Sequence, residues 1–281
     1  MAGWWRRWQR WRRQRTLERR PIPDVLWRRT LRRFPFLHRR SEESLTRLRE
    51  LATLFLADKE FTGAGGLEVT DAMAVAIAAQ ACLPVLELGL DGYAEFVGIV
   101  VHPHAVAAPR TRTDELGVVH HYTEELSGEA MDGGPLMLAW SEVAAAGHSA
   151  AQGYNVVIHE FVHVLDLRAG RGGAPRLDAA WSENLGLEYQ RFVKRLDAGE
   201  ETWLDPYGAE AVEEFFAVAA EAFFVAPERL ASDEPALYAL LVPFFRQDPA
   251  AESHAFGATR RTGARIPGAA HRRREAMKKG A

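Results

Sequence analysis

The chain has 281 residues, 47% of them hydrophobic, which is enough apolar material for the core of one large domain or of two small ones. A single cysteine, Cys82, excludes an internal disulfide and favours a reducing compartment, so we expect a cytoplasmic protein. The longest apolar run, from Ala72 to Leu90, contains polar residues, glycine and proline. It is therefore expected to form core structure and not a membrane span.

The net charge of −3 is unevenly distributed. Residues 1–20 carry eight arginines and one glutamate, a net of +7, and residues 251–281 carry eight lysines and arginines and two glutamates, a net of +6. The remainder, 21–250, is therefore near −16. This pattern predicts a basic Trp/Arg-rich arm at 1–20, a folded domain at 21–250 and a basic disordered tail at 251–281. Because the basic residues lie outside the folded part, we expect no specific nucleic-acid partner.

In the arm, Trp4, Trp8 and Trp11 recur at helical spacing among the arginines. A helix here would have an aromatic stripe and a cationic face, which could contact a membrane or nucleic acid or dock on the acidic body. The alternative is a solvated and partly disordered tail, which is common at termini. The arm has no apolar stretch before a small-residue cleavage site, so we expect no secretory signal.

Hydrophobic periodicity predicts the elements that follow the arm. Helices are expected over 21–40, 41–61, 70–83, 155–170, 177–197, 209–224 and 235–245. Continuous β-prone runs predict buried strands at 96–101 and 136–140. Ser41, Thr70 and Asn155 are placed to cap helices. The loop expected at 105–132 is long enough to help shape a substrate site.

The helix expected at 155–170 contains His159-Glu160-Phe161-Val162-His163. On an α-helix His159 and His163 lie on one face, and Glu160 lies about 100° round from His159. Two neutral imidazoles at this spacing can bind one zinc ion, and the carboxylate can take the proton of the water that zinc activates. The pattern predicts a zinc hydrolase with two histidine ligands and Glu160 as the general base. The alternative is a pair of buried histidines that backbone groups satisfy.

A catalytic zinc site needs a third protein ligand and an open position for water. The position six residues after His163 is Ala169, so the three-histidine pattern of metzincins is absent. The next candidate is a carboxylate on a later helix. Five glutamates qualify by position, and the pattern does not choose among Glu183, Glu188, Glu213, Glu214 and Glu221.

Several separated segments, among them 134–140, 155–166 and 207–228, resemble the Mlc titration factor A family. These are zinc peptidases of the gluzincin type, with a catalytic core related to that of anthrax lethal factor, and the similarity extends over about 21–249. The resemblance implies an α+β fold for 21–250, a zincin-like metallopeptidase with a small sheet and a mostly helical second half. It also implies a peptide substrate, aminopeptidase-like hydrolysis and one zinc ion (Zn2+) per chain. A rival function is implied too, the binding and sequestration of Mlc, a transcriptional repressor of sugar uptake.

In that family the third ligand is a glutamate seven residues after a tyrosine, and Tyr207 and Glu214 have this spacing here. The resemblance therefore selects Glu214 as ligand and Tyr207 as hydrogen-bond donor to the developing oxyanion. Glu213 would then face solvent. Val218 stands where thermolysin-like sites have an aspartate, so Asp166 becomes a candidate to orient an imidazole. The alternatives are a packing tyrosine at 207 and a surface aspartate at 166.

The resemblance also suggests a role for the strand at 136–140. In zincins an edge strand beside the cleft pairs with the extended backbone of the substrate. The sequence alone predicts a core strand instead, and both interpretations stay open.

Overall fold

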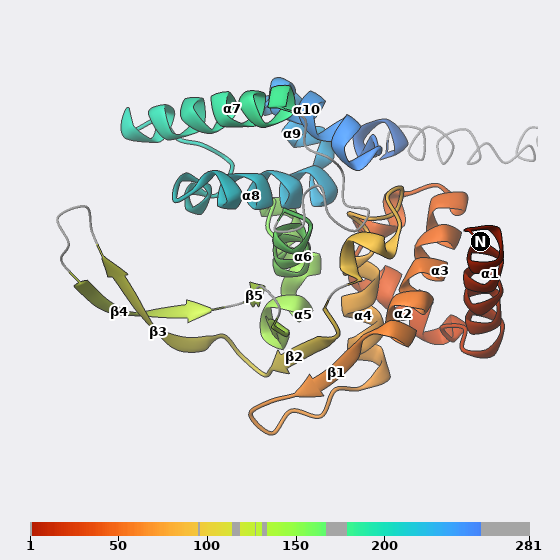
Figure 1. Cartoon of the computed structure of the whole chain (residues 1–281). Helices are drawn as coiled ribbons and strands as arrows, with labels where there is room; N and C mark the ends of the chain where they lie inside the picture. Colours follow the sequence, from red (N-terminus) through yellow and green to blue (C-terminus); the bar gives the residue numbers. More distant parts are fainter. Residues whose placement is uncertain are drawn as a thin grey trace, which may run out of the picture.

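The computed structural model describes residues 2–94, 96–113, 119–126, 128–130, 134–166 and 179–253. It contains a small sheet at one side of a mostly helical body, so the predicted α+β class is confirmed (Figure 1). The glycine-rich segment at which the central helix is predicted to end lies outside the described residues, as do residues 254–281 of the predicted tail. Among the helices that the structure describes, none has both the length and the apolar character needed to cross a membrane.

Four short strands form the main sheet: β1 (Glu60–Gly63), β2 (Gly98–His102), β5 (Gly128–Ala130) and β6 (Leu136–Ala139). Their order is β1-β2-β6-β5, in which β1, β2 and β6 are parallel and β5 is antiparallel to β6. The expectation of an edge strand at 136–140 is therefore wrong, and the core-strand interpretation is confirmed. The reason is that the preceding segment folds back as β5 and covers the outer edge of β6. Trp140 already belongs to the next helix.

The expectation of a loop at 105–132 is also wrong. This segment contains an antiparallel pair, β3 (Val106–Thr113) and β4 (Val119–Leu126), followed by β5. The pair extends away from the helices (Figure 1). Valine, threonine and tyrosine occur along β4, and these residues favour extended backbone. The strands lack a continuous apolar run, which is why the hydrophobic pattern does not predict them.

In the described part of the chain, four α-helices precede the second strand: α1 (Ala2–Arg19), α2 (Asp24–Arg33), α3 (Glu42–Asp58) and α4 (Asp71–Ala81). The predicted caps are confirmed, because the hydroxyls of Ser41 and Thr70 accept hydrogen bonds from the first turns of α3 and α4. Helix α3 ends before residue 61, the predicted boundary. The buried ammonium of Lys59 donates to the carbonyls of Tyr93 and Phe96 at 2.6 and 2.7 Å, which ties the extended chain entering β1 to the core.

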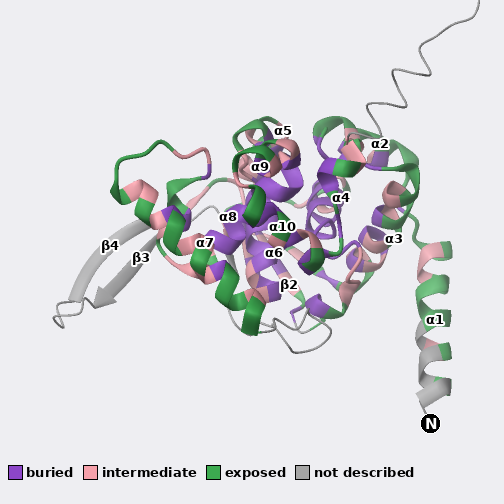
Figure 2. Cartoon of the chain, turned by 90° about the horizontal axis from the view of Figure 1, so that it is seen from above, coloured by how far each residue is buried: buried purple, intermediate pink, exposed green. Residues whose placement is uncertain are grey.

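The N-terminal arm is helical over residues 2–19, so the folded interpretation is confirmed. Helix α1 contacts α3 and extends from it away from the rest of the body (Figure 2). The arm is therefore an ordered part of the surface.

Helices make up most of the chain after β6: α5 (Trp140–Ser149), α6 (Val156–Asp166), α7 (Ala179–Asp197), α8 (Val212–Val225), α9 (Pro227–Asp233) and α10 (Pro235–Phe245). The mostly helical second half is confirmed. The bounds of α10 are those predicted, and α6, α7 and α8 correspond to predicted helices. Helices α5 and α9 are short and were not predicted, because they lack a long apolar periodicity of their own.

Helix α6 lies in the middle of the molecule (Figure 1). Its fully buried Phe161 packs against Phe55, Tyr93 and Phe96, with ring centroids 5.0 to 5.7 Å apart. The opposite face of α6 carries the two histidines, since residues 159 and 163 lie about half a turn from residue 161. Helix α8 packs on α6, and the candidate site lies between these two helices.

Candidate metal centre

A polar network at its first turn positions α6. The Oδ1 atom of Asn155 accepts a hydrogen bond from the backbone N–H of Ile158 at 3.0 Å, so the predicted cap is confirmed. The Nδ2 atom of Asn155 donates to Oε1 of Gln80, on α4, at 2.8 Å. Because Asn155 and Gln80 are fully buried, this contact fixes the start of α6 against α4.

His159 and His163 lie on one face of α6, and Glu214 reaches them from the first turn of α8. The Nε2 atoms of the two histidines are 3.1 Å apart, and Oε2 of Glu214 is 3.1 and 3.2 Å from them. Within the described residues, these three side chains are the one group of His, Cys, Asp or Glu with all ligand atoms within 4.8 Å of one another. The structure thus brings together the three residues predicted to bind metal.

The donor set fits a zinc ion. Tetrahedral zinc binds nitrogen and oxygen at about 2.0–2.2 Å, which places neighbouring ligand atoms about 3.3 Å apart. The three separations here are 3.1 to 3.2 Å. Burial alone would raise the pKa of Glu214, but the two imidazoles outweigh it and lower the pKa to about 2, so the carboxylate is ionised. Both ring nitrogens of His159 face carboxylates, which contradicts the alternative of histidines satisfied by backbone.

Glu221 lies two turns after Glu214 on α8 and orients His159. Its Oε1 accepts a hydrogen bond from Nδ1 of His159 at 2.7 Å, and its Oε2 accepts one from the backbone N–H of Asn155. A proton on Nδ1 leaves the lone pair of Nε2 directed at the cluster, which is the tautomer that a metal ligand needs. The side chain of Glu221 is only 2% exposed, and burial raises its pKa.

Glu160 lies against the edge strand β5. A Cβ atom added to Gly128 would be 2.5 Å from both Cγ and Oε1 of Glu160, so the strand can approach this closely only with a glycine there. Burial raises the pKa of Glu160 to about 7, although His159 and His163 lower it. A carboxyl group with this pKa can both accept and return a proton near neutral pH.

Tyr207 lies at the rim of the cluster on the short helix η4 (Pro206–Ala209), just before α8. Its backbone N–H donates to Oδ1 of Asp205 at 3.0 Å, which fixes the start of η4. The ring centroids of Tyr207 and His159 are 6.1 Å apart, and Tyr207 is 40% exposed. The phenol thus lies beside the histidines and is accessible to solvent.

The other acidic candidates do not join the three ligands. Glu183 and Glu213 are exposed, and Glu188 accepts an ion-pair hydrogen bond from Arg191 at 2.6 Å. The carboxylate that orients His159 is Glu221. Asp166, the predicted candidate to orient an imidazole, ends α6, and that role stays a prediction. The sequence pattern presents Glu221 only as a candidate ligand. Its spacing of two helical turns from Glu214 is the signal that could have suggested the orienting role.

Comparison with known proteins identifies the family of the chain. A family model described as "Glucose-regulated metallo-peptidase M90" matches residues 8–246. An uncharacterized protein of Synechocystis sp. is 34% identical over 245 residues, which are 84% of this chain and 89% of that protein. Mlc titration factor A is 33% identical in Escherichia fergusonii, over 76% of this chain and 83% of the relative, and in Klebsiella pneumoniae, over 81% and 88%. The chain therefore belongs to the family of glucose-regulated metallopeptidases M90.

Proposed function

We propose that this protein is a zinc-dependent peptide hydrolase with a zincin-like site and aminopeptidase-like activity. The observation that carries the proposal is the convergence of His159, His163 and Glu214, with ligand atoms 3.1 to 3.2 Å apart, beside a buried Glu160. Membership of a metallopeptidase family supports the same chemistry. The aminopeptidase specificity is carried by the resemblance of the sequence to Mlc titration factor A.

Each side chain of the cluster has a distinct role in this proposal. When bound, zinc would polarise the substrate carbonyl and lower the pKa of a water molecule. Glu160 takes a proton from the attacking water and returns it to the leaving amine, a role that suits its pKa of about 7. Tyr207 donates a hydrogen bond to the developing oxyanion. Glu221 keeps Nε2 of His159 unprotonated and directed at the centre.

The extended substrate would pair with β5 and not with β6. In the described sheet β5 is the edge strand, and Gly128 brings its backbone against Glu160. A peptide that adds to this edge would have its own backbone beside the general base. The strand order thus supports pairing of the substrate with β5. The sequence resemblance suggested the strand at 136–140, which is β6, for the same role.

The substitution Glu160→Gln tests the proposal. It removes the proton acceptor but keeps the shape of the side chain and leaves the three ligands in place. We expect stoichiometric zinc and at least about a hundredfold loss of peptidase turnover. Zinc is measured by elemental analysis, and turnover with aminoacyl anilides and with the same peptides bearing an acetylated N-terminus.

The matched control is Glu213→Gln, which changes an exposed glutamate next to the third ligand. It should keep both zinc and turnover. Activity that survives in Glu160→Gln would show that Glu160 is not the base. Equal turnover of free and acetylated peptides would disprove the aminopeptidase specificity but leave peptide hydrolysis intact.

A second function, binding of the repressor Mlc, is supported by the name of the relatives, Mlc titration factor A. Because the relatives cover most of this chain at 33% identity, we propose that this protein also binds a repressor of that kind. Glu160→Gln should retain this binding, since the substitution does not change the outer surface. Calorimetry with purified Mlc measures it, and no binding by either form would reject this function without affecting the peptidase.

A further inference from the structure

Helix α1 carries positive charge that the fold does not neutralise. Residues 1–20 contain eight arginines and one glutamate. Among the arginine side chains of α1 that the structure describes, Arg13 alone contacts a carboxylate, that of Asp91 at 3.4 Å, and both groups are exposed. The remaining described guanidinium groups are therefore available to an anionic partner.

The same helix exposes indole rings. Trp4 and Trp11 are 72% and 54% exposed, and with Trp8 they share one face because they are spaced by three and four residues. The guanidinium of Arg12 lies over the ring of Trp8 and that of Arg15 over the ring of Trp11, each 4.9 Å from the centroid. Aromatic and cationic groups thus alternate along this face.

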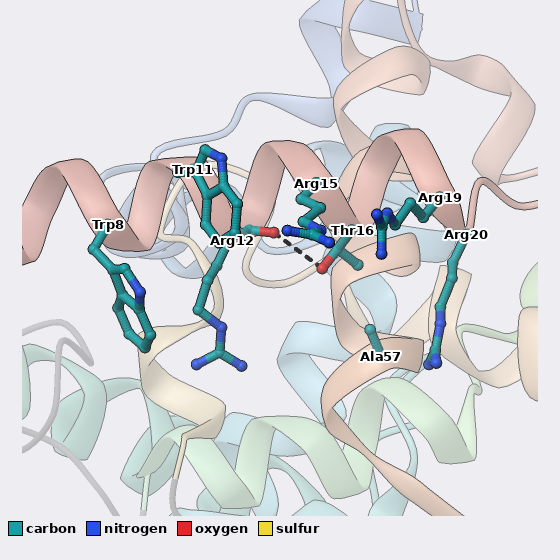
Figure 3. Close-up of a pocket in the computed structure, with 8 residues that line it drawn as sticks. All are labelled: Trp8, Trp11, Arg12, Arg15, Thr16, Arg19, Arg20 and Ala57. Atoms are coloured by element: carbon teal, nitrogen blue, oxygen red, sulfur yellow. Dashed lines mark hydrogen bonds between the residues drawn. The ribbon is translucent and has the colours of Figure 1, made fainter.

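A groove of about 410 Å³ lies between this face and the end of α3. Arg12, Arg15, Arg19 and Arg20 contribute to its walls with the two inner tryptophans, and Ala57 of α3 closes the far side (Figure 3). Figure 3 shows Trp8, Arg12 and Arg20 reaching from the helix toward the side on which Ala57 lies. A groove with four guanidinium groups and no carboxylate in its lining can accept a phosphate group.

Charge and hydrophobicity together favour an anionic lipid surface over a nucleic acid. Phosphates alone would use the arginines, but they would leave the indoles of Trp4 and Trp11 in water. The guanidinium groups of Arg12 and Arg15 already cover one face of Trp8 and Trp11, so a base could stack only on the other face of each ring. In the headgroup region of a bilayer, tryptophan buries its ring and arginine reaches the phosphates. The surface of an anionic bilayer can therefore bind the indole rings and the arginines at the same time.

The position of α1 allows this contact. The helix extends away from the body, so it can lie on a surface while the acidic remainder, near −16, stays at a distance from the anionic headgroups (Figure 2). The family match begins at residue 8, so Trp4 lies outside the matched region. The residues that line the groove lie within that region, and none of them belongs to the metal centre.

We propose that α1 binds the surface of membranes that contain anionic phospholipid, with phosphates in the arginine-lined groove and Trp4 and Trp11 among the headgroups. The test uses the full chain in a flotation assay with vesicles of phosphatidylcholine, with or without phosphatidylglycerol. The wild type should float with the anionic vesicles only, and high salt should release it, because the attraction is electrostatic.

Two pairs of variants separate the contributions of charge and indole. Arg12→Glu with Arg19→Glu, two residues that line the groove, should reduce the floating fraction at least about tenfold, whereas Arg32→Glu with Lys194→Glu, which changes the net charge equally on α2 and α7, should not. The double variant Trp4→Ser with Trp11→Ser should bind the vesicles more weakly. The control Val25→Ser with Leu187→Ser, which changes two exposed apolar residues, should bind as the wild type does. Circular dichroism confirms that each variant is folded.

Three results would overturn the proposal. The first is equal flotation with neutral and anionic vesicles, and the second is wild-type flotation of the Arg12 and Arg19 variant. The third is binding to single-stranded or duplex DNA that depends on these residues, without flotation of any vesicle, which would assign the surface to nucleic acid.

Discussion

Glu221 lies outside the cluster of His159, His163 and Glu214, yet it contacts one member of that cluster. Its carboxylate accepts hydrogen bonds from Nδ1 of His159 and from the backbone N–H of Asn155, the residue that caps α6. The same group therefore sets the tautomer of one ligand and the position of the helix that carries both histidines.

We predict that Glu221→Gln lowers zinc affinity by about 10–100-fold, because an amide lacks the charge that favours the proton on Nδ1. The affinity is measured by competition with a chromogenic chelator. Glu213→Gln is the control, since that side chain is exposed on the same helix. Equal affinities of the two variants would show that Glu221 is only a packing residue.

Among the elements, β5 has only three residues, yet it lies directly beside Glu160. It closes the edge of β6 and passes beside Glu160 at Gly128. A strand that short is held by its pairing with β6 and by its contact with α6. Its place next to Glu160 therefore depends on the absence of a side chain at one position.

We predict that Gly128→Ala lowers turnover about a hundredfold while zinc remains bound, because the new methyl group displaces either the strand or the carboxyl of Glu160. Steady-state kinetics and elemental analysis measure the two quantities. Gly186→Ala, on α7, is the matched control, because a Cβ there meets no atom within 4 Å. Full activity of Gly128→Ala would contradict the close approach of β5.

At the scale of the whole molecule, an ion pair joins the segment between α2 and α3 to the C-terminal end of the described chain. Arg40 is buried and donates to Glu252 at 3.1 Å, and Ser44 donates to the other carboxylate oxygen at 2.9 Å. The guanidinium of Arg40 also lies 5.8 Å from the ring centroid of Phe224 on α8. Glu252 belongs to a helical turn at 249–253, so the first residues of the predicted tail are ordered against the N-terminal helices.

We predict that Glu252→Ala lowers the free energy of unfolding by about 2 kcal/mol, because it leaves the buried Arg40 without its counter-charge. The estimate is below the value for a fully buried pair, since the side chain of Glu252 is 32% exposed. Urea denaturation measures the change. Glu200→Ala, which removes an exposed partner of Arg195, should cost less than about 1 kcal/mol. Equal losses would mean that burial of Arg40 does not matter.

Local features of the chain were predictable because neighbouring residues decide them. The caps at Ser41, Thr70 and Asn155 and the bounds of α10 follow from side-chain chemistry within one or two turns. The β3–β4 pair and the edge position of β5 were not predictable, because pairing between strands depends on contacts that no local pattern records.

For the metal centre, the sequence by itself determined that His159 and His163 share a helix face with Glu160 beside them, since α-helical geometry alone places them there. Glu214 needed the resemblance to a family, because residues 51 positions from His163 meet only through the packing of α8 on α6. The tertiary structure alone decided that Glu221 orients His159 and that Gly128 faces Glu160. Both contacts arise where separate elements meet, and free energy of packing, not sequence spacing, brings those elements together.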